Sequence, residues 1–473
     1  MKAINKLITI SMTVALLQYC ISENVHAQER DSTLTLPAAL KTALVQHQII
    51  KAKENYTRAS AQGIITAKRD GLPDVTLAAQ QAYGTINGLN GLASALPGVI
   101  TMQTGPVAQT QNWNAAFAAT YSSNINWNLF SFGLQKAHVA EARGIYNTSE
   151  ADLEQEKFEL QIKVAGAYLN LLSAERVHYS MNVNLYRVSQ LRVVILARTI
   201  NGLNPGVDST IANAELARAR IAVTDAIAYE QSQQRELAMQ MGITQQNFSL
   251  DTSFITRIPA QLPAQPLNDI SAHPFLKYLN MRVRSSELTA NYISKTKMPK
   301  VSLFGALQDR GSGFGTEYGT GNPRDFSRNY LNGIDPVRAN YLIGVGITWN
   351  ISDMTRVASR VKSQHFYSDG LNNEYRYQEN VLTNQLEEGN RQLTNTLEKY
   401  KQAPIQLKAA SEAYEQKKML YSNGLATIVD VTQALYNLNR AETDQDIASN
   451  SVWQSLLYIA ASSGDLNLLL NQL

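Results

Sequence analysis

The chain nearly lacks cysteine, because Cys20 is the only one among 473 residues. An internal disulfide is therefore excluded, as is a zinc site built from several thiolates. Cys20 also lies in an N-terminal segment that we expect to be removed on export. The mature chain would then contain no thiol at all, which excludes cysteine catalysis.

The chain also lacks a large excess of either positive or negative charge, since it has 42 basic and 39 acidic residues. No basic tract suggests nucleic acid as a partner. After the first 27 residues, no segment approaches the roughly 18–20 continuous apolar residues of a membrane-spanning helix. The exported chain is therefore periplasmic or secreted, or it is an outer-membrane protein whose strands carry the membrane signal in alternation.

The first 27 residues have the pattern of a secretory signal peptide. Two lysines precede a largely apolar stretch at 7–21, and residues 25–27 offer small side chains at the usual cleavage positions. A retained anchor and a lipid-modified Cys20 are the alternatives. The bulky tyrosine directly before Cys20 disfavours lipidation, so we predict cleavage after residue 27.

The rest of the chain is a tandem duplication. A shift of 222 positions aligns the two halves without a gap from Trp127 to Gly242, whose counterparts are Trp349 and Gly464. Upstream the offset becomes 226, which pairs His47 with His273. Self-similarity at a fixed offset indicates repeated structural units. We predict a signal peptide at 1–27, a first repeat at 28–248 and a second repeat at 249–473.

Each repeat contains segments with the two-residue period of a β-strand. Residues 113–128 and 340–351 alternate apolar and polar side chains, with aromatic residues near the ends of the apolar face. This pattern is typical of transmembrane strands, although a half-buried strand in a soluble sandwich has it too. Shorter candidates follow prolines, at 73–83 and 299–308. Four strands cannot close a barrel alone, so either interpretation must account for exposed edges.

Most of each repeat is predicted to be helical. Residues 133–200 contain no proline, and the matching region 355–421 is interrupted only by Pro404. Each would form a helix of about 100 Å, too long for a globular core. Each repeat also has two shorter predicted helices. One precedes the strands, at 37–68 or 268–297, and the other follows the Gly-Leu turn. Laid end to end, these two match the length of the long helix. We therefore predict long antiparallel helical hairpins, with Gly and Leu at their turns.

No catalytic constellation can be assembled from the sequence, so an enzyme is not expected. The six histidines have no metal-binding spacing, and no cofactor-binding pattern is present. We interpret His47 and His273 as residues that mark helix starts. The prediction is that the chain holds neither a metal nor a cofactor.

Four strands and long paired helices, duplicated after a signal peptide, resemble the TolC-like outer-membrane efflux family. The resemblance covers essentially the whole mature chain. It rests on the segments TIVDV (427–431), WNLFSFG (127–133) and WNISD (349–353), with the Gly-Leu turns at 202–203 and 424–425 and the prolines at 73 and 299.

The resemblance implies an α+β, mainly α fold. The helical hairpins would form a tunnel in the periplasm, and each protomer of a homotrimer would add four strands to a twelve-stranded transmembrane β-barrel in the cell outer membrane. The implied function is a passive exit duct of a tripartite efflux or type I secretion system. Its implied partners are a periplasmic adaptor protein, an inner-membrane transporter and outer-membrane lipid.

The resemblance also assigns roles to individual residues. Gly202, Leu203, Gly424 and Leu425 match the hairpin tips that dock the adaptor. The aromatic and apolar residues expected to face lipid are Trp113, Phe117, Tyr121, Ile347 and Trp349.

The periplasmic entrance would lie beside the second tip. Asp430 matches an aspartate that forms a ring around the closed entrance, and Tyr421 matches a tyrosine that latches it. The sequence departs from the family twice: Gln433 stands at a second acidic position, and Ala426 stands at a latch arginine. Asp208, the first-repeat counterpart of Asp430, is expected either to cap its helix or to line the pore.

A second functional class stays open at this point. Long helices and polar loops are also typical of a structural or adhesive coiled-coil surface protein. Such a protein needs no lipid-facing strands, so a charged residue at Phe117 or Ile347 would leave its membrane assembly unchanged.

Overall fold

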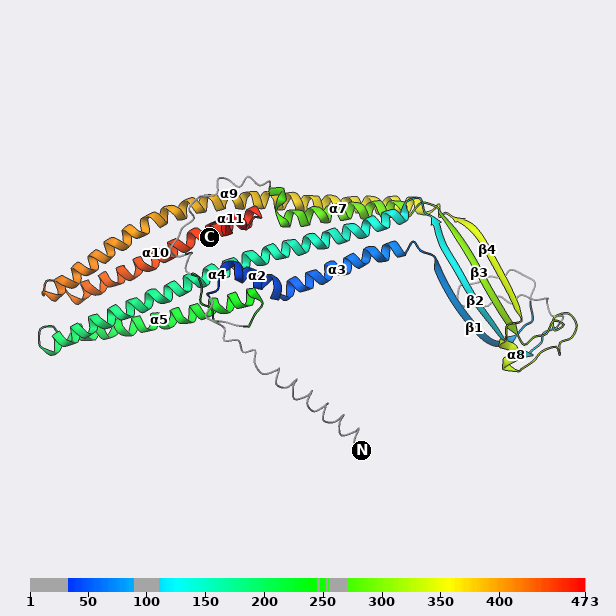
Figure 1. Ribbon diagram of the computed structural model, residues 1–473, viewed down its shortest axis with the longest axis horizontal. Coiled ribbons are helices and arrows are strands. Elements are labelled where there is room, and N and C mark those ends of the chain that lie inside the picture. Colours follow the sequence, from blue (N-terminus) through cyan, green and yellow to red (C-terminus); the bar gives the residue numbers. More distant parts are fainter. Residues whose placement is uncertain (1–32, 89–109, 245–246, 252–253, 255–269, 473) are drawn as a thin grey trace, which may run out of the picture. The chain divides into compact units, whose positions relative to one another are not determined.

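The computed structural model describes residues 33–88, 110–244, 247–251, 254 and 270–472. The predicted signal peptide and Cys20 lie outside these residues. Two compact units are formed, each from several stretches of the chain (Figure 1). The helical unit comprises Met1–Asn55, Ala151–Lys277 and Arg376–Leu473, and the sheet unit comprises Tyr56–Glu150 and Tyr278–Tyr375. Each unit thus draws on both sequence repeats.

The sheet unit contains one antiparallel sheet of four strands in the order β1-β2-β3-β4. The strands are β1 (Asp74–Thr85), β2 (Ala115–Phe130), β3 (Lys300–Ser312) and β4 (Arg338–Thr348). The first repeat supplies β1 and β2, and the second supplies β3 and β4. Within the described chain, β1 and β4 are edges with no strand on their outer side. All four strands lie at or near the positions predicted from alternation.

The strand register separates an apolar face from a polar face. Val75, Ile125 and Ile343 share the apolar face, because Val75 pairs with Ile125, Ile125 with Gly305, and Gly305 with Ile343. The polar face carries a row of asparagine and serine side chains, among them Ser122, Asn124, Asn126, Asn128 and Ser302. Large apolar side chains stay uncovered on β4, where Ile347 is 75% exposed.

A short helix lies over the apolar face at the end where the strands are joined by loops, here called the loop end. This helix, α8 (Tyr330–Ile334), packs on β2 and β3. A side chain at Gly333 would collide with Phe117, since its Cβ would lie 2.3 Å from the Phe117 Cβ. The strand predicted at 299–308 is longer in the structure, because β3 continues to Ser312, and α8 follows before β4 begins.

The long helices form where the sequence predicts them. In the first repeat they are α4 (Leu134–Ile200) and α5 (Gly206–Met241), and in the second α9 (Asp353–Ser422) and α10 (Ile428–Ser463). The second long helix is continuous, as predicted: α9 runs through Pro404. Proline removes only one backbone donor, and buried Leu393 and Tyr414 hold the helix on either side.

The shorter helices before the strands begin at two histidines. The predicted helix 37–68 is split into α2 (Leu36–Gln46) and α3 (Gln48–Arg69), with His47 in an extended conformation between them. In the second repeat, the 3-10 turn η1 (Ile270–Ala272) precedes α7 (Pro274–Lys295), and a short α11 (Asn467–Leu470) ends the chain. Both imidazoles accept a backbone N–H two residues later, through Nδ1.

Tertiary packing explains the split at His47. Helix α5 ends at Gly242, which has a φ of 70° and lies so close to His47 that an added Cβ would approach the His47 Cα to 2.8 Å. Gly464 meets His273 in the same way, at 2.9 Å, with a φ of 78°. A backbone can come this near only where glycine replaces a larger residue. The duplicated sequence therefore makes the same helix junction twice.

Apolar clusters hold the helical unit together, and two of them join both hairpins. The larger one joins α2, α4, α5 and α10 around buried Leu36, Tyr168, Leu237 and Trp453. The second lies near the hairpin turns and joins both hairpins through Ile195, Tyr421, Val431 and Leu435, together with smaller residues. The hairpins are thus fixed to each other near their tips by buried contacts.

Candidate functional site

The two hairpin turns have the same backbone geometry. Gly202 has a φ of 71° and Gly424 a φ of 76°, the left-handed conformation that glycine adopts without strain. In the first turn Leu203 N donates to Arg198 O at 2.9 Å, and in the second Leu425 N donates to Leu420 O at 2.9 Å. This pairing, with the glycine at the second position after the helix, is the Schellman motif.

Both turns present a leucine to solvent. Leu203 is 68% exposed and Leu425 is 74% exposed. In a Schellman motif the residue after the glycine commonly packs back on the helix, and neither leucine is buried in this way. Each tip therefore carries an apolar side chain that nothing in the described chain covers.

The aspartate that follows the first turn is engaged with the second hairpin. Asp208 is only 9% exposed, and its Oδ2 accepts from the Tyr421 hydroxyl at 3.3 Å and from Asn204 Nδ2 at 2.8 Å. Asn204 Nδ2 also contacts the Tyr421 hydroxyl oxygen. Tyr421 itself is buried, at 5% exposure. Burial, followed by the nearby charge of Asp208, raises the pKa of Tyr421, so the hydroxyl stays a donor at neutral pH.

Arg198 completes this cluster from the last turn of α4. Its guanidinium donates to the backbone carbonyl of Ser422 at 2.8 Å and to Asn204 Oδ1 at 3.0 Å. It also lies over the Tyr421 ring, 5.8 Å from the centroid. Arg198, Asn204 and Asp208 of the first hairpin thus hold Tyr421 and Ser422 of the second. We call these five residues the tip clasp.

The aspartate that follows the second turn has a different role. Asp430 forms a capping box at the start of α10: Thr427 Oγ1 accepts from Asp430 N, and Asp430 Oδ2 accepts from Thr427 N at 3.0 Å. Lys417 Nζ lies 3.4 Å from its Oδ1. The bonds from Thr427 and then the lysine lower the pKa of Asp430, so it is ionised at neutral pH.

The expected roles of the two aspartates are therefore partly exchanged. Helix capping was considered for Asp208, yet α5 begins after Pro205 without a side-chain cap. Capping is instead performed by Asp430, whose side chain remains 40% exposed. The cap and a place at an entrance are compatible, because only some of the lone pairs of the carboxylate are used.

The two departures from the family pattern lie close to Asp430. Gln433 is exposed, one turn along α10, and bonds to Asn437 Oδ1 at 3.1 Å. Ala426 packs against the buried cluster beneath the tips. No arginine follows Gly424, but Arg198 brings a guanidinium to the same tyrosine from the other hairpin.

Sequence reasoning missed Arg198 and Asn204. At the offset of 222 their counterparts in the second repeat are Leu420 and Ala426. A comparison of the two copies, position by position, would have shown that polar side chains gather at the first turn. Their partners across the clasp could not be identified without the fold.

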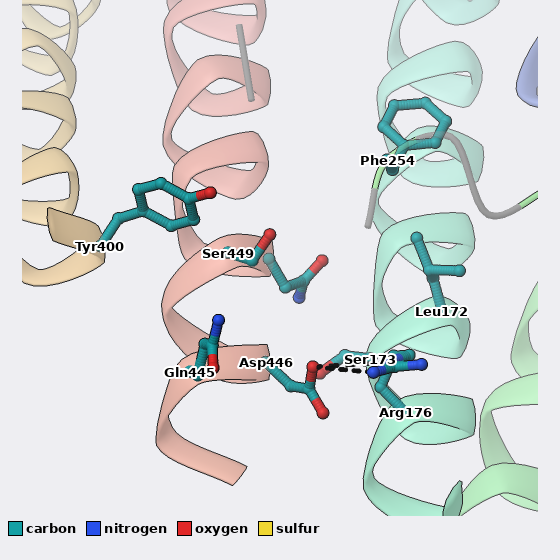
Figure 2. Close-up of a pocket in the computed structure, with 9 residues that line it drawn as sticks. Leu172, Ser173, Arg176, Phe254, Tyr400, Gln445, Asp446 and Ser449 are labelled. Carbon is teal, nitrogen blue, oxygen red and sulfur yellow. Dashed lines mark hydrogen bonds and ion pairs between the residues drawn. The ribbon is translucent and has the colours of Figure 1, made fainter. Parts of the chain in front are cut away.

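Farther from the tips, charged pairs connect α4 to α10. Arg187 donates to both carboxylate oxygens of Glu442, at 2.7 and 2.6 Å, and Arg176 contacts Asp446 at 3.3 Å. A cavity of about 190 Å³ opens beside the second pair, lined by polar side chains from α4 and α10 and by Tyr400 of α9 (Figure 2). Burial raises the pKa of Asp446, and Arg176 offsets part of this shift.

The first hairpin also contains a cluster of titratable groups. Burial, and then the charge of Glu230, raise the pKa of Glu175 to about 7. Glu230 pairs with His178 Nδ1 and accepts from Gln234 at 3.1 Å. At the repeat offset the counterparts of Glu175, His178 and Glu230 are Leu397, Tyr400 and Val452, which form an apolar cluster in the second hairpin.

The residues expected to face lipid are not equivalent in the structure. Phe117, Tyr121 and Ile347 share the apolar face of the sheet, but α8 covers the first two. The Phe117 ring contacts Tyr330 edge-on at 5.1 Å, and the Tyr121 hydroxyl donates to Ile334 O at 3.2 Å. Only Ile347 is openly exposed among the three.

The two tryptophans lie just outside the strands. Trp113 precedes β2 at the loop end and is 81% exposed. Trp349 follows β4 at the opposite end, where its Nε1 donates to Lys297 O at 3.1 Å. Trp127 makes the matching bond to Gly71 O in the first repeat, at 3.0 Å.

Within the described residues, no group of three or more His, Cys, Asp or Glu side chains is arranged to hold a metal ion. A search of the same residues finds no helix with the length and apolar character needed to cross a membrane.

Residues 272–465 match the family model described as outer membrane efflux protein. No curated protein matches the chain. The family match lies wholly within the second predicted repeat, the copy that contains Tyr421 and Asp430.

Solved structures of outer-membrane channels share the fold across most of the chain. OprN is 19% identical with a TM-score of 0.70, and the match covers 91% of this chain and 89% of the OprN chain. VceC from Vibrio cholerae is 15% identical with a TM-score of 0.68, and the match covers 91% of this chain and 96% of the VceC chain. CmeC from Campylobacter jejuni is 13% identical with a TM-score of 0.70, and the match covers 93% of this chain and 90% of the CmeC chain. These structures confirm the predicted fold class. The family model supports the predicted resemblance over residues 272–465, and its description agrees with the predicted outer-membrane location.

Proposed function

We propose that this chain is an outer membrane efflux protein and that it forms a homotrimeric exit duct through the outer membrane. The duct performs no chemistry of its own. A periplasmic adaptor protein docks on the helical tips and links the duct to an inner-membrane transporter in a tripartite efflux or type I secretion system. Exported molecules pass along the axis of the trimer.

One observation carries this proposal: within the described residues the sheet has two unpaired edges and an apolar face that α8 covers only at the loop end. Open edges invite pairing with another chain, and large exposed apolar patches mark interaction or membrane surfaces. Pairing β4 of one protomer with β1 of the next satisfies both edges, and three copies give twelve strands. The apolar face then contacts lipid, while the asparagine-rich face lines a water-filled lumen.

The position of α8 limits the part of the apolar face that could contact lipid. Because α8 covers Phe117 and Tyr121, the lipid-contacting band is proposed to run below them, through Leu77, Ile343 and Ile347. Trp349 then marks the interface at the end of the band away from the loops, as aromatic residues do in such barrels. Trp113 lies on the loop side of Phe117 and is proposed to lie outside this band.

Fractionation of cells, native mass measurement and planar-bilayer recording test the duct. The protein should sediment with the outer membrane, form a trimer and conduct ions, and a soluble monomer would contradict the proposal. Ile343→Lys should abolish membrane assembly, because a lysine in the lipid band costs about 2–4 kcal/mol. Asn340→Lys, on the polar face of the same strand, is the matched control and should assemble. If Ile343→Lys also assembles normally, the adhesive coiled-coil alternative is favoured.

Docking of the adaptor is supported by the exposed leucines at both tips. Replacing Leu203 and Leu425 together with glutamate should block export in cells that contain the complete pump. The trimer should form unchanged, because neither side chain is buried. Normal export by this double variant would remove the tip-docking proposal.

The tip clasp is proposed to hold the periplasmic entrance closed. It ties the two hairpins of one protomer together beside Asp430, whose carboxylate is exposed. Around a threefold axis three such carboxylates would attract cations and repel each other. Asp430→Asn should therefore weaken block by divalent cations added on the periplasmic side. Identical block across salt and pH would refute an entrance ring at this position.

A further inference from the structure

Two arginines face each other at the loop end of the sheet. Arg310 of β3 and Arg338 of β4 are direct cross-strand partners. Their register places both on the polar face, in line with Thr120 of β2. Asp309, the neighbour of Arg310 along β3, points to the opposite face, where it pairs with Tyr121.

Like charges directly opposite each other destabilise a sheet unless something neutralises them. Among the described residues, neither arginine has a carboxylate within 4.0 Å, and neither donates a side-chain hydrogen bond. Both are exposed. The pair is therefore a concentrated positive charge with no counter-ion from the described part of its own chain.

The surroundings add little negative charge. Among the described strand residues of the polar face, the only carboxylate belongs to Asp74, at the far end of β1 opposite Asn126, where Lys300 also lies. The connection from β1 to β2, residues 86–114, contains no charged residue in its sequence. The other connection contains Glu317, Asp325 and Asp335 beside two arginines, and Asp325 Oδ2 already accepts Glu317 N at 2.9 Å.

We infer that Arg310 and Arg338 form a binding site for anionic groups at the outer mouth of the duct. The inference rests on the proposed trimer, in which three pairs would set six guanidinium groups around the lumen. Arg side chains suit this role because their planar donors bind carboxylate and phosphate in two-point fashion. Rings of arginine or lysine are also how pores favour anions. The duct is therefore suited to release molecules that carry phosphate or carboxylate groups.

Planar-bilayer recording of the purified full-length trimer tests the site, with inorganic tripolyphosphate as the probe. Added on the loop side, the probe should block current, and Arg310→Gln with Arg338→Gln should raise the half-blocking concentration about tenfold or more. The reversal potential in a KCl gradient should shift toward cation selectivity. Lys300→Gln, at the other end of the same face, is the control and should leave loop-side block unchanged.

Two outcomes would overturn the site while leaving the duct in place: unchanged loop-side block in the double glutamine variant, or equal block of the wild type from both sides. The double lysine variant keeps the charge and should retain most of the block, which separates charge from folding. A wild-type protein that forms trimers but never conducts would instead refute the duct itself, and the site with it.

Discussion

The two hairpin tips share a backbone but differ in what their aspartates do. Both turns place glycine at a φ near 70° to 76° and expose a leucine. At the first tip Asp208 is buried against Tyr421, whereas at the second tip Asp430 caps its own helix and remains exposed. The aspartate of the first tip therefore bonds to the other hairpin, whereas the aspartate of the second tip bonds within its own hairpin and stays partly exposed.

The difference shows how duplication can separate roles. The turn is set by glycine and by backbone hydrogen bonds, so it survives wherever those residues remain. The contacts made by the turn depend on a few side chains that have diverged, such as Asn204 against Ala426 and Pro205 against Thr427. An asymmetric contact between the two hairpins is the result, and it is the feature best suited to hold an entrance closed.

The largest effect is expected from breaking the first tip. Asp208→Ala leaves the buried Tyr421 hydroxyl and the Asn204 amide without their acceptor, which should reduce the stability of the tip contact by about 2–3 kcal/mol. Bilayer recording should show higher or noisier conductance, and thermal unfolding in detergent should show a lower Tm. The double variant Tyr421→Phe with Asp208→Ala should lose less stability than the sum of the two single losses, because both changes remove the same hydrogen bond. Fully additive effects would mean that the clasp is not a unit.

A second comparison concerns the charged cluster between α4 and α5, which is apolar in the second repeat. Glu175→Leu installs the residue found at its counterpart, Leu397, and should raise the free energy of unfolding at pH 8 by about 1–2 kcal/mol after allowance for solvent screening. The pKa of Glu175 rises from its ordinary 4.5 to about 7 on folding, so the folded state binds the extra proton between these values.

The sign of the pH dependence follows from that difference. Ionisation of Glu175 lowers wild-type stability as pH rises from 4.5 through 7, and below 4.5 the penalty is gone. The Tm, measured by thermal unfolding between pH 4 and pH 8, should therefore depend more steeply on pH in the wild type than in either Glu175→Leu or Glu175→Gln. The glutamine variant separates charge from packing, and parallel profiles for all three proteins would contradict the assignment.

A smaller effect is expected at the second tip. Thr427→Ala removes the capping box of α10 and should cost about 1 kcal/mol. The loss should be local, so conductance should change less than in Asp208→Ala. Hydrogen exchange of the first turn of α10 measures it directly. If Thr427→Ala opened the channel as strongly as Asp208→Ala, the division of roles between the tips would be wrong.

The smallest effect should be the same at both tips. Gly202→Ala and Gly424→Ala place a Cβ in open space but in a left-handed conformation, with a net cost of roughly 0.5–1 kcal/mol each. Equal Tm shifts are expected because the two backbones match. By contrast, Gly242→Ala would collide with the His47 backbone and should cost clearly more than either.

Local pattern was sufficient for most of the fold. Two-residue alternation located the strands, the absence of proline and the apolar period located α4, and paired glycines located both turns. A misjudgement arose where distant parts meet: the helix near His47 divides because Gly242 packs against it. The structure also covers Phe117 with α8, a contact between segments more than 200 residues apart.

By itself the sequence determined the duplication, the periodicity of each element and the positions of the turns, because these depend on residues adjacent along the chain. Only the tertiary structure decided which side chains meet across those elements. It joined Arg198, Asn204 and Asp208 to Tyr421, assigned capping to Asp430, and set Arg310 against Arg338. Such pairings depend on the register between helices or strands, and no local residue pattern specifies that register.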